Sequence, residues 1–579
     1  MQREWVVAEP INDDVRQQFP ALSPSTIQLL QNRGLVTQTQ VDEFLAPDYR
    51  VHVHDPFLFR DMEKAVARLF VAIREKQKIL VHGDYDADGI CAATLTVTML
   101  ESLGADVAVF LPHRERDGYG LNTDTVTQAI ADGVRVIITC DCGIANTAEI
   151  TIAQAGGIDV IITDHHAMPA VLPQAFATIH PKVPGESYPW DGLAGGGVAF
   201  KLVQALQARA EAAGFPPPAP GFDKWLLDLV AISSVADMVP LLGETRTLVK
   251  FGLVVLAKTK RVGLQKLMEA AGVFDEHGVP KHAIDANTIG FQIAPRINAA
   301  GRLDHARRSF DVLMEKDPTL ATSFAAALHE TNADRQRQTE KCVLEARSQV
   351  ITNGWEQDAA IVVAGDWPPG LVGLVAGRLA EQFFRPVFAV SLRERAVGSG
   401  RSIPGYHVVE AMQSFPDVFE KFGGHPQACG FTVKEGKVDD LRTKLRDHAS
   451  AAFAGKELKP TLAIDAEIAL EAVTWEFYET VRQFEPFGIG NMEPRFCAKK
   501  LRIVDCGTVG SEGKHLRLSV AHHSGEQRKM IAFGFGSMAA ELFPGAMIDA
   551  IFTVDVNEWK GNRELQLKVV DMRSAVVHA

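Results

Sequence analysis

The hydrophobic pattern in the first third of the chain alternates short apolar runs with longer amphipathic stretches. The runs at residues 79–81, 134–138 and 160–162 are continuous enough to predict buried strands. The stretches at residues 90–100 and 145–154 are rich in Ala, Thr, Ile and Leu and predict helices. Alternation of this kind predicts an α/β fold in which helices cover both faces of a doubly wound, parallel sheet.

Each of these predicted strands is followed by acidic or imidazole side chains. The first leads into Asp84, Asp86 and Asp88, the second ends at Asp141, and the third ends at residues 164–166, which read Asp-His-His. Parallel strands place their carboxyl ends at one edge of the sheet, where ligands usually bind. An acidic loop or helix N-cap would explain one such motif. The same polar ending on three strands favours a divalent-cation site instead.

Asp237 is a fourth candidate, because it follows another apolar run at residues 229–236. In order and spacing, the four motifs resemble those of the DHH phosphoesterase superfamily. The resemblance rests on residues 82–89, His-Gly-Asp-Tyr-Asp-Ala-Asp-Gly, and on Asp141, residues 164–166 and Asp237. It implies hydrolysis at a pair of Mn²⁺ or Mg²⁺ ions, and oxygen ligands with one or two imidazoles suit these metals.

The expected roles within the motifs differ. We expect the two ions to be bound by Asp86, Asp88, Asp141, His165 and Asp237, with Asp141 bridging them. Asp84 and His82 are further candidate ligands, and the assignment of ligands to individual ions stays open. Asp141, His165 and His166 are the expected catalytic residues. We expect His166 to contact the scissile phosphate and Asp164 to support the ligands from behind.

Several polar loops outside these motifs are candidates for binding phosphate. Ordinary surface charge and plain turns are the alternative, but arginine can grip phosphate oxygens in pairs. A glycine-rich helix start at residues 195–197 offers backbone N–H groups, although close packing explains such glycines as well. A second α/β unit begins near residue 359, and its Gly-Gly-His loop resembles that of the DHH-associated domain. The individual candidates are Arg114, Arg296, Arg302, Ser399, Arg401, Gly424 and His425.

The remaining patterns predict a connecting helix and a terminal barrel. Residues 318–351 contain no proline after Pro318 and predict one long helix, on which Arg335 and Arg337 either line a cleft or are solvated. After a linker at residues 455–460, short strands at regular spacing predict a small barrel of the OB type. Its basic residues and Phe533 suit single-stranded nucleic acid.

Composition and net charge restrict the class of protein and its expected location in the cell. A formal net charge of −13 argues against a broad basic surface, but it leaves room for a local basic groove. The amino terminus has no signal-peptide pattern, and no apolar run approaches the ~18 residues of a membrane span. The seven cysteines are scattered and predict reduced thiols. These features favour a cytoplasmic protein.

The order of the predicted domains resembles the bacterial RecJ family. We expect a lead-in at residues 1–45, a DHH phosphoesterase domain at 46–310, a connecting long helix at 311–352, a DHH-associated domain at 353–455 and an OB-fold-like nucleic-acid-binding domain at 460–579. The resemblance implies a monomeric exonuclease that degrades single-stranded DNA from the 5′ end in DNA repair and recombination. It also implies two partners, the single-stranded-DNA-binding protein and a repair helicase.

Two other functions are compatible with parts of the pattern. One is a DHH-type phosphodiesterase of short oligonucleotides or cyclic dinucleotides, which the extra barrel disfavours. The other is a non-catalytic single-strand-binding scaffold on the same fold. A scaffold would be expected to have lost ligand residues, whereas every motif carboxylate is present.

Overall fold

The computed structural model describes residues 3–522, 525–559 and 561–575, and it divides into two compact units. One unit comprises Val53–Val239 and Leu248–Leu458. The other comprises Met1–His52, Pro240–Thr247 and Lys459–Ala579. Within the described part of the chain, no helix combines the length and the apolar character that crossing a membrane requires.

The first sheet carries the DHH motifs and is parallel throughout, as the alternating pattern predicted. Its strands lie in the order β3 (Val107–Phe110), β2 (Lys78–Gly83), β4 (Val134–Cys140), β5 (Asp159–Thr163) and β6 (Ala177–Ile179). The chain runs from β2 to β3 on one side and returns to β4 on the other. The strand order therefore reverses at β2, which is where open α/β sheets form their binding crevice.

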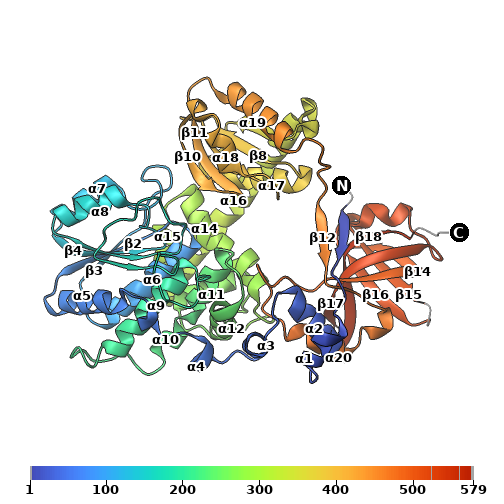
Figure 1. The fold of residues 1–579 in the computed structure, drawn as a ribbon, viewed down its shortest axis with the longest axis horizontal. Coiled ribbons are helices and arrows are strands. Elements are labelled where there is room, and N and C mark those ends of the chain that lie inside the picture. The colour runs from blue at the N-terminus through green and yellow to red at the C-terminus, as the bar shows by residue number, and fades with distance from the viewer. Residues whose placement is uncertain (1–2, 523–524, 560, 576–579) are drawn as a thin grey trace. The chain divides into compact units, whose positions relative to one another are not determined.

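Helices cover both faces of this sheet (Figure 1). On one face, α7 (Thr123–Ala131) and α8 (Thr147–Ala155) pack on Leu80, Ile137 and Val160. On the other face lie α5 (Met62–Arg74), α6 (Ala87–Ser102) and α9 (Gly195–Arg209). Side chains alternate between the two faces of a strand, so a strand that is buried on both sides must be apolar throughout.

A helical layer follows the sheet along the chain. The apolar run before Asp237 forms helix α11 (Leu227–Ala236), and its residues from Leu227 to Ser234 are all buried. The layer continues through α10 (Phe222–Trp225), α12 (Gly243–Leu256), α13 (Val262–Ala270), the π-helical turn η2 (Thr288–Ile293), α14 (Ala294–Leu303) and α15 (Arg307–Met314). The predicted long helix is α16 (Pro318–Thr352), which begins at the N-cap Asp317.

The second α/β domain has a mixed sheet of order β10 (Phe419–His425), β11 (Ala428–Val433), β9 (Val397–Arg401), β8 (Val387–Ser391) and β7 (Ile361–Gly365). Only β7 and β8 pair in parallel. Helix α17 (Val372–Phe383) packs against β8 and β9. This sheet places Ser399 and Arg401 on β9 and Gly424 and His425 at the end of β10.

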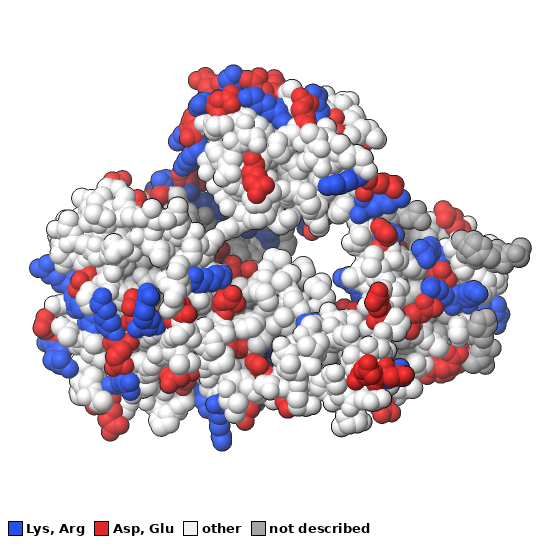
Figure 2. Space-filling model, viewed as in Figure 1, with Lys and Arg blue, Asp and Glu red and all other residues white. Residues whose placement is uncertain are grey.

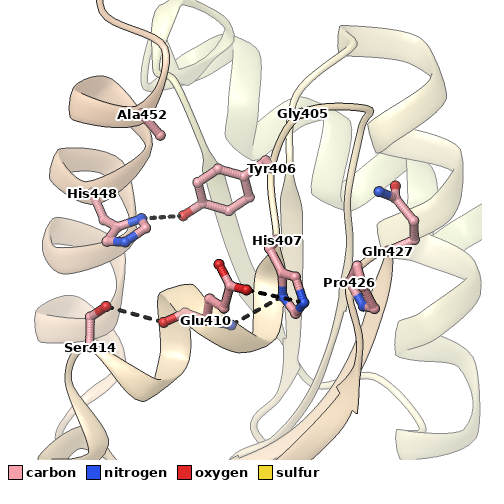
Figure 3. Close-up of a pocket in the computed structure, with 9 residues that line it drawn as sticks. All are labelled: Gly405, Tyr406, His407, Glu410, Ser414, Pro426, Gln427, His448 and Ala452. Atoms are coloured by element: carbon pink, nitrogen blue, oxygen red, sulfur yellow. Dashed lines mark hydrogen bonds and ion pairs between the residues drawn. The ribbon is translucent and has the colours of Figure 1, made fainter. Parts of the chain in front are cut away.

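A polar cavity of about 500 Å³ lies between α18 (Val408–Gln413), α19 (Val438–Ala452) and the β10–β11 turn (Figure 3). Its polar groups bind one another: the Tyr406 hydroxyl lies 3.1 Å from His448 Nδ1, and the Glu410 N–H donates to His407 Nδ1. The Val408 N–H donates to the Pro426 carbonyl. The cavity wall therefore supports the turn that follows His425.

The C-terminal unit contains the predicted barrel. A ring of five strands closes because β14 (Phe496–Val509) pairs with both β15 (His515–Ala521) and β17 (Met547–Trp559), and β16 (Gln527–Ala532) and β18 (Asn562–Ser574) complete it. Outside the ring, β12 (Thr461–Ile464) pairs in parallel with β1 (Glu4–Val7), near the amino terminus.

The first helices of the chain belong to this barrel unit rather than leading into the first domain. They are α1 (Asp13–Gln18), α2 (Pro24–Asn32), α3 (Gln38–Leu45) and α4 (Tyr49–His52). Ile27, Leu30 and Phe44 join the same hydrophobic core as Phe496 and Phe552 of the barrel. Burial of these apolar side chains holds α2 and α3 against the barrel, a position that the sequence pattern alone had not indicated.

The segment Pro240–Thr247 lies between the two parts of the first unit along the chain but belongs to the barrel unit. Its Arg246 is 1% exposed and stacks on Phe44, with 3.8 Å between the guanidinium carbon and the ring centroid. The guanidinium donates to the carbonyls of Phe44, Gln483, Phe484 and Glu485 at 2.8–3.2 Å. These bonds satisfy the donors of a buried cation.

Candidate metal centre and phosphate-binding arginines

The acidic loop after β2 combines helix capping with a possible ligand role. Asp86 is the N-cap of α6, and its Oδ1 accepts from the N–H groups of Asp88 at 2.9 Å and Gly89 at 3.2 Å. A Cβ at Gly89 would lie 2.5 Å from the backbone nitrogen of Asp84, so only glycine allows this tight loop. Only Oδ1 is occupied by capping. The capping and cation-binding interpretations of this motif are therefore compatible.

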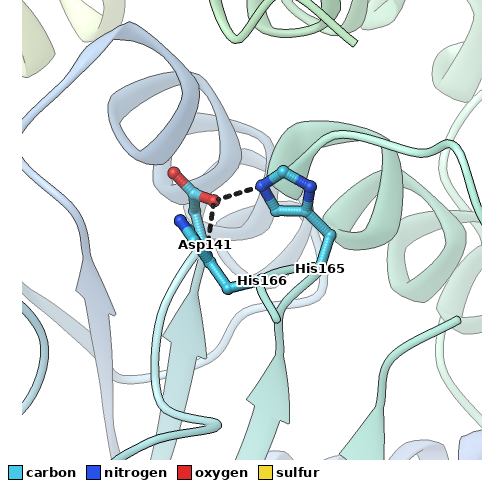
Figure 4. A group of neighbouring side chains, drawn as sticks. All are labelled: Asp141, His165 and His166. Carbon is cyan, nitrogen blue, oxygen red and sulfur yellow. Dashed lines mark ion pairs between the residues drawn. The ribbon is translucent and has the colours of Figure 1, made fainter. Parts of the chain in front are cut away.

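Asp141 follows β4 in a left-handed backbone conformation, with a φ of 63°. This conformation costs a non-glycine residue roughly 1–2 kcal/mol, and such strain is often kept at functional sites. The Asp141 N–H donates to the Thr163 carbonyl at 2.9 Å. The turned backbone brings Asp141 Oδ1 within 3.2 Å of His165 Nε2 and 3.8 Å of His166 Nδ1 (Figure 4).

Asp88 is held by the glycine-rich start of α9. It accepts hydrogen bonds from the N–H groups of Gly195 at 2.8 Å and Gly196 at 2.7 Å, and from Ser233 Oγ at 2.5 Å. A Cβ at Gly195 would lie 2.5 Å from Asp141 Oδ1. These N–H groups, which the sequence offered to a phosphate, therefore bind a protein carboxylate, and the glycines permit its close approach.

His165 lies at the centre of the acidic groups. Its Nε2 is 3.7 Å from Asp88 Oδ2, 3.2 Å from Asp141 Oδ1 and 3.5 Å from Asp237 Oδ2. Asp237 reaches this point from the C-cap of α11, four residues after Ser233. One helix face thus supplies both a support for Asp88 and a candidate ligand.

The ligand atoms form three overlapping groups, each within 4.8 Å. The groups are Asp84 with Asp86 and Asp141, Asp88 with His165 and Asp237, and Asp141 with His165 and His166. Asp141 belongs to two of them. His82, which the sequence suggested as a ligand, belongs to none of these groups among the described residues. It lies buried with Nδ1 3.7 Å from Cys142 Sγ.

Unsatisfied atoms and shifted pKa values show that this set fits hard divalent cations. Within the ligand groups, Asp84 Oδ1, Asp141 Oδ1 and His165 Nε2 are buried without a hydrogen-bond partner. Burial and then the neighbouring carboxylates raise the pKa of Asp84, Asp86 and Asp141, and they raise that of Asp237 to about 8. Burial lowers the pKa of His165 to about 4, which leaves a neutral imidazole with a free lone pair. Crowded carboxylates and a neutral histidine are what a cation requires.

His166 is better suited to donate a proton than to bind a metal. Burial alone would lower its pKa, but the hydrogen bond to Asp164 and the charge of that carboxylate raise it to about 9. Its Nδ1 lies 2.8 Å from Asp164 Oδ1, so this nitrogen is already engaged although geometry groups it with Asp141. Asp164 also accepts from the N–H groups of Ile144 and His165, and it is buried behind the ligands.

Three supporting residues were not found by sequence reasoning. Asn298 Oδ1 accepts from the Ala87 N–H at 2.8 Å, across 211 residues of sequence. Lys182 Nζ donates to the His165 carbonyl at 2.7 Å. His180 Nε2 lies 3.0 Å from the His166 carbonyl, which accepts from a neutral ring because burial lowers the His180 pKa to about 4. Close to Asn298, the absence of a side chain at Gly301 admits Tyr85, whose carbonyl would be 2.4 Å from a Cβ at Gly301.

We expect Asn298→Ala to weaken metal binding by about 10–100-fold, the usual effect of losing a residue that orients ligands. The reason is that the Ala87 N–H, which fixes the Asp86–Asp88 loop, loses its acceptor. Calorimetric titration with Mn²⁺ measures the dissociation constant directly. Asn287→Ala, at an exposed position that contacts Asp285, is the matched control. An unchanged dissociation constant in Asn298→Ala would remove Asn298 from the support of the loop.

Several arginines beside the metal loop form no ion pair with a carboxylate of the described residues. Arg114 stacks 4.0 Å from the ring centroid of Tyr85, and its Nε is buried without a partner. Arg302 Nη1 donates to the Gly370 carbonyl at 3.2 Å, and Arg401 Nη1 donates to Ser399 Oγ at 2.8 Å. Burial, and then the charges of Arg114 and its neighbours, lower the pKa of Arg302 to about 10. Repulsion among these positive charges favours the binding of an anion between the arginines.

Arg296 is placed differently from these arginines. Its Nε and Nη2 lie 3.3 Å and 3.2 Å from His329 Nδ1 on α16, and its Nη1 donates to the Gln292 carbonyl at 2.5 Å. At the tip of the β10–β11 hairpin, Gly424 has a φ of 144°, and His425 is exposed. Burial, and then the charges of His166 and Lys182, lower the pKa of His425.

Comparison with known proteins agrees with this architecture. Models of three families match the chain: the N-terminal domain of the DHH family at residues 78–233, the DHHA1 domain at 357–451 and the RecJ OB domain at 464–571. The single-stranded-DNA-specific exonuclease RecJ of Bacillus subtilis is 34% identical over 572 residues, which cover 98% of this chain and 70% of that protein. The chain belongs to the RecJ family. The RecJ of Dickeya dadantii is 32% identical, with 93% and 94% coverage.

Solved structures of RecJ proteins share the fold. The crystal structure of Thermus thermophilus RecJ in complex with Mn²⁺ has a TM-score of 0.83 at 29% identity, and the match covers 99% of this chain and 79% of that one. The Mg²⁺ complex of the same protein has a TM-score of 0.77. Lys and Arg are interspersed with Asp and Glu over the face in view (Figure 2).

Proposed function

We propose that this chain is a metal-dependent exonuclease that degrades single-stranded DNA from the 5′ end by hydrolysing phosphodiester bonds. The observation that carries the proposal is the overlap of the ligand groups at Asp141, at the sheet edge where the strand order reverses. A shared carboxylate suits two neighbouring cations, and the family comparison favours Mn²⁺ or Mg²⁺. The named substrates of the curated relatives support single-stranded DNA.

The residues divide the chemistry among them. We assign Asp84, Asp86, Asp88, Asp141, His165 and Asp237 to the cations. When bound, two divalent ions supply positive charge that stabilises the attacking and leaving oxygens. Gly196 and Ser233 donate to Asp88 Oδ1 and Gly195 donates to Oδ2, so the carboxylate is held with Oδ2 facing His165. His166, protonated and oriented by Asp164, donates to a phosphate oxygen of the scissile bond.

The choice of end follows from the arginines. A terminal 5′-phosphate carries about two negative charges near neutral pH, and Arg114, Arg302 and Arg401 offer unpaired guanidinium groups beside the metal loop. Ser399 orients Arg401, and His425 is near enough to the site for the charges of His166 and Lys182, besides burial, to lower its pKa. We assign these residues to the terminal phosphate. Arg296 belongs to the same region but is held by His329.

A degradation assay with labelled strands tests the proposal. Single strands labelled at the 5′ or the 3′ end are incubated with Mn²⁺, and a duplex of the same sequence serves as control. We expect the 5′ label to appear at once as a mononucleotide, while the 3′ label shortens stepwise. Loss of the 3′ label first would contradict the polarity. Cleavage of dinucleotides but not of long strands would favour the oligonucleotide phosphodiesterase, and metal-independent binding without cleavage would favour the scaffold.

The barrel is assigned to the trailing strand, and a point substitution tests this role. Phe533 is 56% exposed and meets His515 edge-on, with 5.2 Å between ring centroids. Stacking of one base on an aromatic ring contributes about 1–3 kcal/mol, so Phe533→Ala should lower the affinity for long strands by about fivefold or more. Fluorescence anisotropy with strands of increasing length measures the effect.

The control for this measurement is Val6→Ala, an exposed apolar residue on β1 of the same unit. Equal affinity of Phe533→Ala and the parent protein for long strands would remove Phe533 from the binding surface. A deletion of the barrel is unsuitable, because residues 1–52 and Arg246 pack on it and would lose their core.

The cellular setting is inferred from the family and the thiols. Relatives of this kind are expected to act with the single-stranded-DNA-binding protein and a repair helicase during DNA repair and recombination, and we expect the chain to act as a monomer. The described cysteines are all free thiols, six of them buried. Reduced thiols support a cytoplasmic location.

A further inference from the structure

The arginines beside the metal loop continue onto two further helices. Helix α16 packs against both α14 and α17, and Arg302 at the end of α14 bonds to Gly370, just before α17. Arg401 lies along α17: a Cβ at Gly373 would be 3.0 Å from its Nη2, and one at Gly377 would be 3.9 Å from its Cγ. Arg378 is the next residue of α17. Arg335 lies on α16, six residues after His329, to which Arg296 of α14 bonds.

Arg335 differs from the other basic residues of its helix. Arg337 pairs with Glu330 at 2.9 Å and with Asp334 at 3.6 Å, and Lys341 pairs with Glu345 at 4.0 Å. Arg335 has no carboxylate within ion-pair distance among the described residues. Its Nη2 donates to the buried Asn332 at 2.6 Å, and its Nε is buried without any partner. A guanidinium that is held in one orientation and still has an N–H group without an acceptor is well suited to bind an anion.

More guanidinium groups gather here than one terminal phosphate can neutralise. Arg114 lies beside Tyr85 of the metal loop, Arg302 bonds to Gly370 just before α17, and Arg401 lies along α17. Besides burial, the charge of Arg335 is near enough to lower the pKa of Arg302, and the charge of Arg378 is near enough to lower the pKa of Arg335. One terminal phosphate carries about two negative charges. It leaves the charges of Arg335 and Arg378 uncompensated.

We propose that Arg335, together with Arg378, binds a second phosphate attached to the terminal 5′-phosphate, so that strands ending in a 5′-diphosphate or 5′-triphosphate are accepted as substrates. The inference rests on the proposed function, because it extends the same end-binding site by one phosphate. The reaction itself is unchanged. Water adds to the phosphorus between the first and second nucleotides, the bond to the first 3′-oxygen breaks, and that oxygen takes up a proton. The first product of a 5′-triphosphate strand is then a nucleoside triphosphate.

The test compares two substrates of the same sequence, one with a 5′-monophosphate and one with a 5′-triphosphate, using the full-length protein and Mn²⁺. We measure kcat/KM on each and identify the first product by chromatography. The parent protein should degrade triphosphate strands with a kcat/KM no lower than that on monophosphate strands, and it should release a nucleoside triphosphate first. Arg335→Ala should lower the triphosphate-to-monophosphate ratio by about tenfold or more, the effect of losing a charged hydrogen bond.

Three further variants make the result specific. Arg378→Ala should lower the same ratio, Arg335→Lys should restore part of it because the charge returns, and Arg337→Ala should leave it unchanged because Arg337 is paired on the helix surface. Circular dichroism confirms folding of each variant.

Each contrary result has a distinct meaning. Degradation of monophosphate strands with rejection of triphosphate strands would overturn this inference and leave the proposed function intact. Failure on both substrates would overturn the proposed function as well. An equal decrease on both substrates in Arg335→Ala would also overturn the inference, because Arg335 would then be a general contact.

Discussion

Replacing Asp141 with Asn should lower strand cleavage by at least the roughly 10²–10³-fold that removal of one preorganised charged group costs. Asp141 belongs to two of the three ligand groups, so its loss affects both candidate cation positions. The left-handed backbone that presents Asp141 is compatible with Asn, which tolerates this conformation. Cleavage is followed with end-labelled single strands at saturating Mn²⁺.

The same variant should be at least as stable as the parent protein when metal is removed. Burial and neighbouring carboxylates raise the pKa of Asp141, Asp84 and Asp86, and they raise that of Asp237 to about 8. The folded state therefore holds protons that the unfolded state releases above pH 4. Metal-free stability must fall as pH rises, by about 1.4 kcal/mol per pH unit for each such proton.

The clearest window for this measurement is pH 6.5–8. Below pH 6.5, His82 and His165 have the opposite effect on the stability of the fold. Their pKa values are lowered to about 4, so the stability that their neutral imidazoles contribute is lost as pH falls from 6.5. Between pH 6.5 and 8, His166 has the same effect as the carboxylates. Its pKa is raised to about 9, so the stability that its proton contributes is lost as pH rises. Thermal unfolding with chelator should show a Tm that falls across this window and recovers with Mn²⁺, and Asp141→Asn should flatten the slope.

Asp124→Asn, an exposed residue in the first turn of α7, is the matched control and should change neither activity nor Tm. Full activity of Asp141→Asn at saturating Mn²⁺ would move the centre of the site away from Asp141. A metal-free Tm that rises with pH between 6.5 and 8 would contradict the charge arrangement described above.

Replacing Arg401 with Ala should reduce cleavage of 5′-phosphorylated strands more than cleavage of 5′-hydroxyl strands. A hydrogen bond between charged groups contributes about 1.5–3 kcal/mol, so the ratio of the two rates should fall roughly ten- to a hundredfold. Arg296→Ala should change this ratio less, because its guanidinium is engaged by His329 and Gln292. Initial rates on the two strands, measured side by side, give the ratio.

Arg393→Ala provides the control, because Arg393 precedes the same β-strand but is exposed and paired with Asp366 at 3.1 Å. An unchanged ratio in Arg401→Ala would place end recognition elsewhere, with Arg302 the next residue to replace. A larger effect in Arg296→Ala than in Arg401→Ala would reverse the ranking of these two arginines.

The sheet and its acidic edge were predictable because their signals are local. Continuous apolar runs mark β2, β4 and β5, and the polar residue after each run lies at the same edge whatever the rest of the chain does. The long α16 was equally visible, since one N-cap and an uninterrupted helical composition define it. The barrel followed from short strands at even spacing.

The supports of the site were not predictable in this way. Asn298 and Ala87 meet only because α14 packs beside α6, and no periodicity reports a contact over 211 residues. Glycines at 195 and 196 have the composition of a phosphate loop, and only tertiary packing shows that Asp88 occupies their N–H groups. Arg296 and Arg401 look alike in sequence, and their different neighbours separate them.

Because Pro240–Thr247 belongs to the barrel unit, the ways in which domains of this protein can be deleted or exchanged are limited. Because the chain enters the barrel unit three separate times, at its start, in the middle and at its end, the unit is not a cassette that a single cut can excise or graft. A chimaera that exchanges only residues after 459 would pair a foreign barrel with the native Arg246 and native β1. The hydrogen bonds from Arg246 to the carbonyls of residues 483–485 would then have to be reproduced by an unrelated turn.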